Sequence, residues 1–355
     1  MIHINTYTYI NIYLQYVYTH IHTTFDIMEE KPTYSQNWPA YNHAKTHEKL
    51  LFFKMLRELI DDVVKPEQSF RAGRPNLPFG DLLFSACLRE YSSYSSRKTI
   101  AELQIAHKMG FISHVPHFNS ITNFLRSDAI YEQLQKLIII SALPLKKVES
   151  AIAVDSTGFS VSPFESWNNN KWGKPGSKRG WIKAHVATGT KTQIICSAEI
   201  TDRKSHDSTM FSPLVLTCSN YFSVKEVSAD KAYSSKNNIS LVRGLDAYPY
   251  IMFKKNVNAY TAEFSSFDWL DAWNFFSENE EEFMKHYHKR SNVECAFSMI
   301  KRKYGFKLKG KHFTSQRNEL LCKFLVHNIS VLIQEMFELG LEVKFMQVEQ
   351  VAAQK

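Results

Sequence analysis

Residues 151–159 read AIAVDSTGF, a short run of small and β-branched apolar residues that reaches an aspartate, Asp155. A run of this length and composition predicts a buried β-strand that ends at Asp155. Two more strand-like runs follow, GWIKAHVATG at 180–189 and TQIICSAEIT at 192–201. A short turn that contains Gly189 separates them, which predicts a β-hairpin. The sheet is therefore expected to begin with three antiparallel strands.

The chain then alternates between strand and helix. VKEVSADKAY at 224–233 predicts a strand that ends at Asp230, and YPYIMFKK at 248–255 predicts a fifth strand. Helical spacing is clearest in NELLCKFLVHNISVLIQEMFEL at 318–339. This order predicts an α/β fold, with a mixed five-stranded sheet flanked by helices on both faces. Both aspartates stand at strand ends, where α/β sheets carry their active sites.

The residues before the first strand have a helical pattern and predict a separate N-terminal domain. Helices are expected at 49–64, 79–92, 97–109, 119–127 and 129–141. If the third and fourth of these form a helix-turn-helix, they present four polar side chains to a DNA groove: Asn119, Thr122, Asn123 and Arg126. Two ordinary packed helices are the alternative.

Composition narrows the class of protein. The 355 residues are 44% apolar and carry a net charge of +8, as expected of a globular protein whose surface attracts polyanions. Basic residues gather at 301–311, KRKYGFKLKGK, where six of eleven are Lys or Arg. The five cysteines are scattered without a CxxC pair, which argues against a zinc site or a disulfide framework. The longest apolar run, 137–145, is too short to span a membrane.

Residues 1–27 differ from the rest of the chain. They are rich in Tyr, Ile, Thr, His and Asn and contain no Lys or Arg, so they lack the positive start of a signal peptide. From Met28 the composition becomes ordinary. We interpret the first segment as upstream sequence, with translation starting at Met28; a genuine β-prone extension is the alternative.

A third group of polar residues lies in HYHKRSNVECAFSMIKRKYG at 286–305. If this segment is one helix with 100° per residue, four side chains fall within an arc of roughly 60°: Tyr287, Arg290, Glu294 and Lys301. Such a face offers a carboxylate as a metal ligand beside groups that bind phosphates. The alternative is a solvent-exposed helix with an Arg290–Glu294 ion pair, but apolar residues along the same helix favour a packed one.

The spacing of these four residues, Y-x2-R-x3-E-x6-K, is similar to the signature of DDE transposases of prokaryotic insertion sequences. In that family one aspartate ends a first strand and another ends a fourth strand, as Asp155 and Asp230 are expected to do. Asp230 lies in an element that resembles the family's D-x-x-Y, with Tyr233 in place. Glycine often precedes that tyrosine in the family, whereas this chain has Ala232. The resemblance covers residues 149–335 well and the helical region more loosely.

The resemblance implies a ribonuclease H-like catalytic domain in which Asp155, Asp230 and Glu294 hold two Mg²⁺ ions, with Mn²⁺ able to substitute. Converging carboxylates repel each other, and hard divalent cations with oxygen ligands remove that cost. The implied reaction is DNA strand cleavage and strand transfer of an insertion sequence by two-metal phosphoryl transfer. The implied partners are double-stranded DNA, as terminal inverted repeats and as target, and a second copy in a homodimer. Such a protein works in the cytoplasm, on the nucleoid, without a membrane.

Further side chains are expected to contact DNA. The helix face and the basic run supply Tyr287, Arg290, Lys301, Arg302 and Lys303. Lys183 and His185 alternate to the same face of their strand, so they either touch the DNA backbone or line an exposed edge of the hairpin. The loop WNNNKWGKPGSK at 167–178 suits either an unstacked base or a plain surface loop. His206 and Asp207 are expected to cap the following helix.

This interpretation divides the chain into four parts: an upstream extension (1–27), a helical DNA-end-binding domain (28–148), a ribonuclease H-like catalytic domain (149–340) and a tail (341–355). Two other functions compete with it. One is a catalytically inactive DNA-binding protein derived from a mobile element, against which the three intact carboxylates argue. The other is a ribonuclease H-like nuclease that acts on RNA–DNA hybrids, against which the basic helix face argues.

Overall fold

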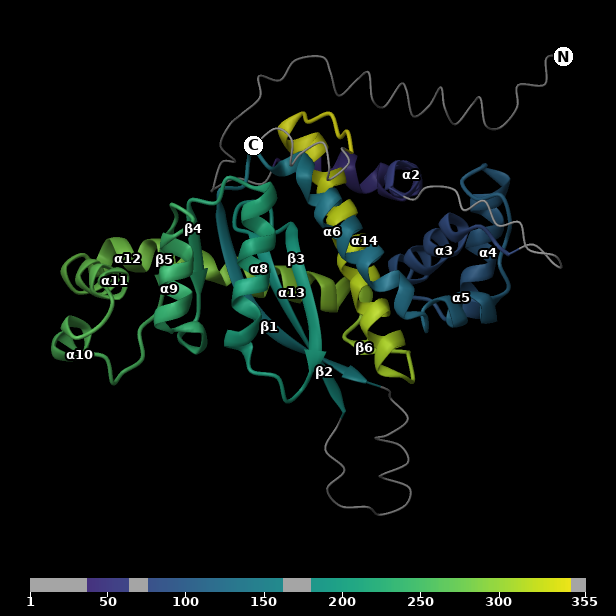
Figure 1. The fold of residues 1–355 in the computed structure, drawn as a ribbon. Helices are drawn as coiled ribbons and strands as arrows, with labels where there is room; N and C mark the ends of the chain where they lie inside the picture. Colours follow the sequence, from purple (N-terminus) through teal and green to yellow (C-terminus); the bar gives the residue numbers. More distant parts are fainter. Residues whose placement is uncertain (1–36, 64–75, 162–179, 346–355) are drawn as a thin grey trace, which may run out of the picture. The chain divides into compact units, whose positions relative to one another are not determined.

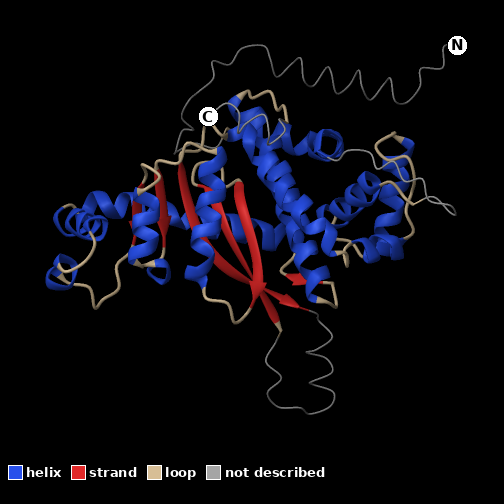
Figure 2. Cartoon of the chain, in the orientation of Figure 1, coloured by secondary structure: helices blue, strands red, loops and turns tan. Residues whose placement is uncertain are grey.

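The computed structural model describes residues 37–63, 76–161 and 180–345. The described residues form two compact units: a helical unit within residues 37–144 and 312–345, and a second unit within residues 145–311. Figure 1 labels their elements and Figure 2 separates helices from strands. The segment 1–27, the loop 167–178 and most of the expected tail lie outside the described residues.

The helical unit confirms the helices that the sequence predicts, and their bounds are α2 (Trp38–Val63), α3 (Phe79–Tyr91), α4 (Ser96–Lys108), α5 (Phe118–Phe124), α6 (Tyr131–Ala142) and α14 (Phe313–Leu339). Its core is α14, which packs against α2, α3 and α6. Among the described helices, α14 alone is long and apolar enough to cross a membrane, but 94% of its most apolar stretch is buried inside the structure. Residues 318–339 were expected in the catalytic domain, yet their contacts join them to the helical unit.

The pair α4 and α5 packs together as either interpretation requires. The N-cap of α5 is His117, whose ring accepts a hydrogen bond from the backbone N–H of Asn119. Asn123 and Arg126 are exposed, whereas Thr122 is half-buried and donates to the carbonyl of the preceding turn. A helix-turn-helix role for this pair stays a prediction.

The second unit contains the sheet, with strands β1 (Ala151–Val161), β2 (Trp181–Gly189), β3 (Ile195–Asp202), β4 (Glu226–Ala229), β5 (Tyr248–Ile251) and β6 (Lys307–Leu308). Their order is β3-β2-β1-β4-β5, with the short β6 also paired to β1. The first three strands are antiparallel, and β4 and β5 continue the sheet in parallel with β1. This is the mixed sheet of the expected ribonuclease H-like fold, with β6 as an unexpected addition.

Strand β1 continues beyond Asp155, so the prediction that it ends there is wrong. The antiparallel partner β2 pairs with β1 as far as Ser160. This pairing keeps the backbone of β1 extended beyond Asp155. On the other edge, β4 pairs only as far as Val154 and β6 pairs only from Ser160. Within the described chain, residues 155–159 therefore have a neighbouring strand on one edge only. This gap opens the sheet beside Asp155.

Helices cover both faces of this sheet: α8 (Asp207–Tyr221), α9 (Lys236–Arg243), α11 (Phe267–Glu278), α12 (Glu280–Tyr287) and α13 (Ser291–Tyr304). The short α10 (Ala259–Glu263) packs against α11. Both α8 and α13 contact β1 and β2, and in Figure 1 they lie on opposite sides of these strands. The segment 286–305 is not one helix as expected, because a 3-10 turn at His288–Arg290 separates α12 from α13. That turn lets His286 and Lys289 both bind the carboxylate of Glu226, at 2.7 and 2.9 Å.

Candidate active site

Two of the predicted carboxylates follow the last residue pair that joins β1 to β4, Asp155 within β1 and Asp230 just after β4. In the parallel pairing of β1 with β4, Val154 lies opposite Ala229, and Asp155 and Asp230 are the next residues of each strand. Neighbouring strands run about 4.8 Å apart. The carboxylate of Asp230 is turned toward its own loop, where it accepts a hydrogen bond of 2.8 Å from the backbone N–H of Ala232. Strand pairing thus brings the two residues together.

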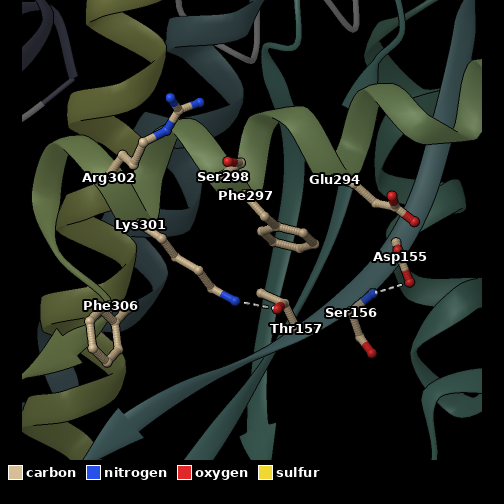
Figure 3. A pocket seen from close by; sticks show the side chains of 9 residues that line it. All are labelled: Asp155, Ser156, Thr157, Glu294, Phe297, Ser298, Lys301, Arg302 and Phe306. Atoms are coloured by element: carbon tan, nitrogen blue, oxygen red, sulfur yellow. Dashed lines mark hydrogen bonds between the residues drawn. The ribbon is translucent and has the colours of Figure 1, made fainter.

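The third carboxylate reaches this place from the first turn of α13. Arg290 contacts Asp155 at 3.2 Å through Nη1 and Glu294 at 2.7 Å through Nη2. Figure 3 shows the carboxylates of Glu294 and Asp155 pointing toward one another. One guanidinium therefore links carboxylates that are 139 positions apart in the chain.

The pKa of Asp155 reflects its burial and its charged neighbours. Burial, with smaller contributions from the charges of Asp230 and Glu294, raises the pKa of its carboxyl group to about 6. The N–H of Ser156 and the guanidinium of Arg290 act in the opposite direction without cancelling the effect. A buried carboxylate with two acidic neighbours is stabilised by a cation.

The chemistry of these residues fits a divalent metal ion, although their present side-chain positions do not form a complete site. Among the residues that the structure describes, no three acidic, histidine or cysteine side chains already converge as ligands. Asp230 caps its own turn, and Glu294 is 56% exposed and held by Arg290. Both would have to turn toward Asp155. The donor set then consists of carboxylate oxygens, which Mg²⁺ and Mn²⁺ prefer.

A cavity of about 460 Å³ extends from these carboxylates along α13. Its lining, drawn in Figure 3, consists of Asp155, Ser156, Thr157, Glu294, Phe297, Ser298, Lys301, Arg302 and Phe306. The ammonium of Lys301 points into it, donates to the hydroxyl of Thr157 at 2.6 Å and lies over the ring of Phe159. Burial lowers the pKa of Lys301. The cavity thus has carboxylates at one end and cations at the other. This arrangement suits a chain of phosphate groups.

The remaining predicted contacts on this side of the sheet stay accessible. Tyr287, the last residue of α12, stays beside Arg290 of the following 3-10 turn, whose guanidinium lies 5.9 Å from the ring centre. Arg302 and Lys303 are exposed on the last turn of α13. The structure therefore groups these residues around the carboxylates, and their contact with DNA stays a prediction.

Lys183 and His185 share one face of β2, as their alternation predicts, but this is the face that α8 covers. Both side chains reach the carboxylate of Asp207, Lys183 at 2.9 Å and His185 at 3.6 Å. The ring of His185 has no exposed surface, so in this structure it cannot contact a DNA backbone. Burial lowers the pKa of this ring to about 4.

The contacts of Asp207 could not be predicted from the sequence. It was expected to cap α8, but that helix has no side-chain cap. Its carboxylate instead accepts a hydrogen bond from the hydroxyl of Ser156 at 2.9 Å and pairs with Lys183. Period-two alternation shows which strand residues share a face, whereas a helix-borne partner on that face leaves no signal in the sequence.

Comparison with known families agrees with this geometry. A family model described as a transposase DDE domain matches residues 146–329, which is more than half of the chain. The matched range includes every strand of the sheet and the three carboxylates at 155, 230 and 294. The chain therefore belongs to the DDE transposase family.

Proposed function

We propose that this transposase cuts DNA strands at the terminal inverted repeats of an insertion sequence and transfers the free ends to target DNA. Membership in the family gives an enzyme that acts on DNA in transposition. One observation carries the more specific proposal: Asp155 and Asp230 follow paired strand residues, and Arg290 ties Glu294 to Asp155. Three carboxylates from distant segments are thus gathered at one open strand edge.

In this proposal Asp155, Asp230 and Glu294 hold two Mg²⁺ ions, for which Mn²⁺ can substitute. When bound, such a pair of ions activates an oxygen nucleophile and stabilises the leaving oxygen of a phosphodiester. Asp155, which Arg290 links to Glu294 and strand pairing places beside Asp230, would be the carboxylate common to the site. Arg290 then exchanges its carboxylate partners for phosphate oxygens, which its planar fork binds well. Lys301 supplies a point charge for a phosphate deeper in the cavity.

DNA reaches the site over a basic surface. Lys303 and Arg302 are exposed at the end of α13, and the basic run that they begin continues to residue 311. Tyr287, at the end of α12, lies at the opposite end of this proposed DNA-binding surface. We infer that the helical unit contributes recognition of the terminal repeats and that two copies pair the two DNA ends. The protein would then act on the nucleoid in the cytoplasm.

A cleavage assay tests this function. The substrate is a supercoiled plasmid that carries the gene with its genomic flanks, in the presence of Mg²⁺ or Mn²⁺. The wild type is expected to cut at the element ends. Asp155→Asn and Glu294→Gln should abolish cleavage and leave affinity for a labelled duplex unchanged. Asp246→Asn, which removes an exposed carboxylate elsewhere in the same unit, is the matched control.

Three results would contradict the proposal. Wild-type protein that binds the ends without cutting them would be a DNA-binding protein without catalysis. Protein that cuts RNA–DNA hybrids with no preference for the element ends would be a nuclease of another kind. Loss of duplex binding together with cleavage in Glu294→Gln would make Glu294 a structural residue.

A further inference from the structure

The strand that carries Asp155 is held by side chains where it lacks a neighbouring strand. Within the described chain, only β2 pairs with residues 155–159. Successive side chains of a strand point to opposite faces, so Ser156 and Thr157 project to different sides. On one side Lys301 donates to the hydroxyl of Thr157 at 2.6 Å. On the other side Asp207 accepts from the hydroxyl of Ser156 at 2.9 Å.

Asp207 is well suited to anchor this strand. It is the first residue of α8, and Lys183 of β2 pairs with it at 2.9 Å while also donating to the carbonyl of Ser205. Burial alone would raise the pKa of Asp207, but hydrogen bonds from Lys183 and Ser156 outweigh it and lower the pKa. The carboxylate is therefore ionised at neutral pH and links a helix, a loop and two strands.

The anchor acts on the carboxylate of Asp155 through one intervening residue. The backbone N–H of Ser156 donates to Oδ1 of Asp155 at 2.8 Å, and the hydroxyl of the same serine donates to Asp207. A shift of Ser156 would therefore change the direction of the Asp155 carboxylate. Buried Tyr233 packs nearby, and burial, followed by the charges of Asp155 and Asp207, raises the pKa of its hydroxyl group.

We propose that Asp207 is a positioning residue of this transposase, which fixes Ser156 and through it the direction of the Asp155 carboxylate. This inference rests on the proposed function, because it assigns Asp207 a task for the same three-carboxylate site. Asp207 itself faces the α8 side of the sheet, away from the cavity on the α13 side. It therefore neither touches DNA nor replaces one of the three carboxylates.

The test compares Asp207→Asn, Ser156→Ala and Ser156→Thr with the wild type. Mn²⁺ binding to the full chain is measured by calorimetry, plasmid nicking by its rate, and duplex binding by fluorescence anisotropy. We expect Asp207→Asn and Ser156→Ala each to weaken Mn²⁺ binding and slow nicking roughly tenfold, as loss of an outer partner of a metal ligand does. Duplex affinity should not change. Ser156→Thr keeps the hydroxyl and should restore both properties.

Two further measurements make the test specific. The double variant Asp207→Asn/Ser156→Ala should lose no more than either single variant, because both remove one interaction. Asp268→Asn removes a carboxylate from the first turn of another helix, α11, and should leave Mn²⁺ binding and nicking at the wild-type level.

The inference is overturned if Asp207→Asn and Ser156→Ala bind Mn²⁺ and nick DNA as the wild type does while Asp155→Asn is inactive. It is also overturned if the losses are additive, or if duplex binding and thermal stability fall in step with activity. Nicking by Asp155→Asn at the wild-type rate would instead refute the proposed function. The two failures are therefore distinguishable.

Discussion

The guanidinium of Arg290 lies between the carboxylates of Asp155 and Glu294, where we expect a metal ion to bind. Its two terminal nitrogens contact one carboxylate each, and its side chain is only 21% exposed. Burial raises the pKa of Asp155 to about 6, and the guanidinium offsets the cost of this buried negative charge only in part. A divalent ion would compensate it better, because it carries twice the charge and binds the oxygens directly.

This arrangement predicts that Arg290→Gln is sensitive to metal. Without divalent ions the variant leaves partly buried carboxylates unpaired and should lose about 1–3 kcal/mol of unfolding free energy. With saturating Mg²⁺ the loss should shrink. Denaturant unfolding in EDTA and in Mg²⁺ measures both values. Arg243→Gln breaks an ion pair with Asp271 elsewhere in the unit and should behave alike in the two conditions. Equal losses of Arg290→Gln in both would contradict this role.

The raised pKa of Asp155 predicts how stability depends on pH. The folded state holds this proton more tightly than the unfolded state, so metal-free protein loses stability as the pH rises from about 4 to about 6. Asp155→Asn has no such proton and avoids the loss. At pH 7.5 in EDTA it should therefore be more stable than the wild type by about 1–3 kcal/mol, and at pH 4 the difference should nearly vanish. If the wild type is as stable as Asp155→Asn at pH 7.5, or more stable, the ionised carboxylate of Asp155 does not destabilise the folded state.

At the scale of elements, Glu149 fixes the turn between β2 and β3. Its buried carboxylate accepts hydrogen bonds from the backbone N–H of Lys191 and Thr192 and from the hydroxyl of Thr192. A Cβ at Gly189 would lie 2.2 Å from this carboxylate carbon, so the turn needs glycine there. The hairpin that the sequence predicts is thus held from outside by a residue that precedes β1.

Glu149→Ala should therefore be strongly destabilising. It leaves several buried donors without their acceptor, which costs roughly 2–4 kcal/mol. Thermal unfolding measures the loss, and Glu278→Ala, at the exposed end of α11, should change the melting temperature little. A small effect of Glu149→Ala would mean that water or a neighbouring group replaces the carboxylate in the turn.

The order of strands and helices could be predicted because periodicity records which residues are buried. Alternation in 180–189 and helical spacing in 49–64 were enough for the type of each element. The extension of β1 beyond Asp155 depends on its partner β2, which local sequence does not show. The break at 288–290 depends on Glu226, which binds two residues around that turn.

The three carboxylates of the candidate site could be picked out in advance because each stands in a recognisable local context. An aspartate in or just after a buried strand-like run and a polar motif with regular spacing are both visible in the sequence. The hydrogen bond between Asp207 and Ser156 could not be predicted. It joins residues 51 positions apart on two elements, and only the packing of the fold decides that these elements face each other. The burial of His185 has the same origin: alternation gives its face, but not that α8 covers it.

For the whole molecule, the chain leaves the helical unit, forms the sheet unit and returns to the helical unit with α14. The amphipathic pattern of 318–339 predicts a buried helix but not the unit in which it is buried. Just before this return lies the basic run 301–311. We propose that its exposed cations contact the DNA backbone.

Ionic strength should therefore control DNA binding. Arg302→Gln removes one exposed cation beside the cavity and should reduce the slope of log affinity against log salt by about 1. Lys285→Gln removes a 73% exposed cation from α12 and serves as the control. Anisotropy titrations of a labelled duplex at several salt concentrations measure both slopes. Identical slopes for wild type and Arg302→Gln would exclude this arginine from the DNA contact.

The metal-bound arrangement of the three carboxylates is tested most directly by anomalous X-ray diffraction from Mn²⁺-soaked crystals. A two-metal site predicts anomalous peaks within about 2.1 Å of carboxyl oxygens of Asp155, Asp230 and Glu294, with Arg290 released from Asp155. Strong peaks elsewhere, or an Arg290 that still bridges Asp155 and Glu294 at saturating Mn²⁺ with no peak beside them, would contradict it.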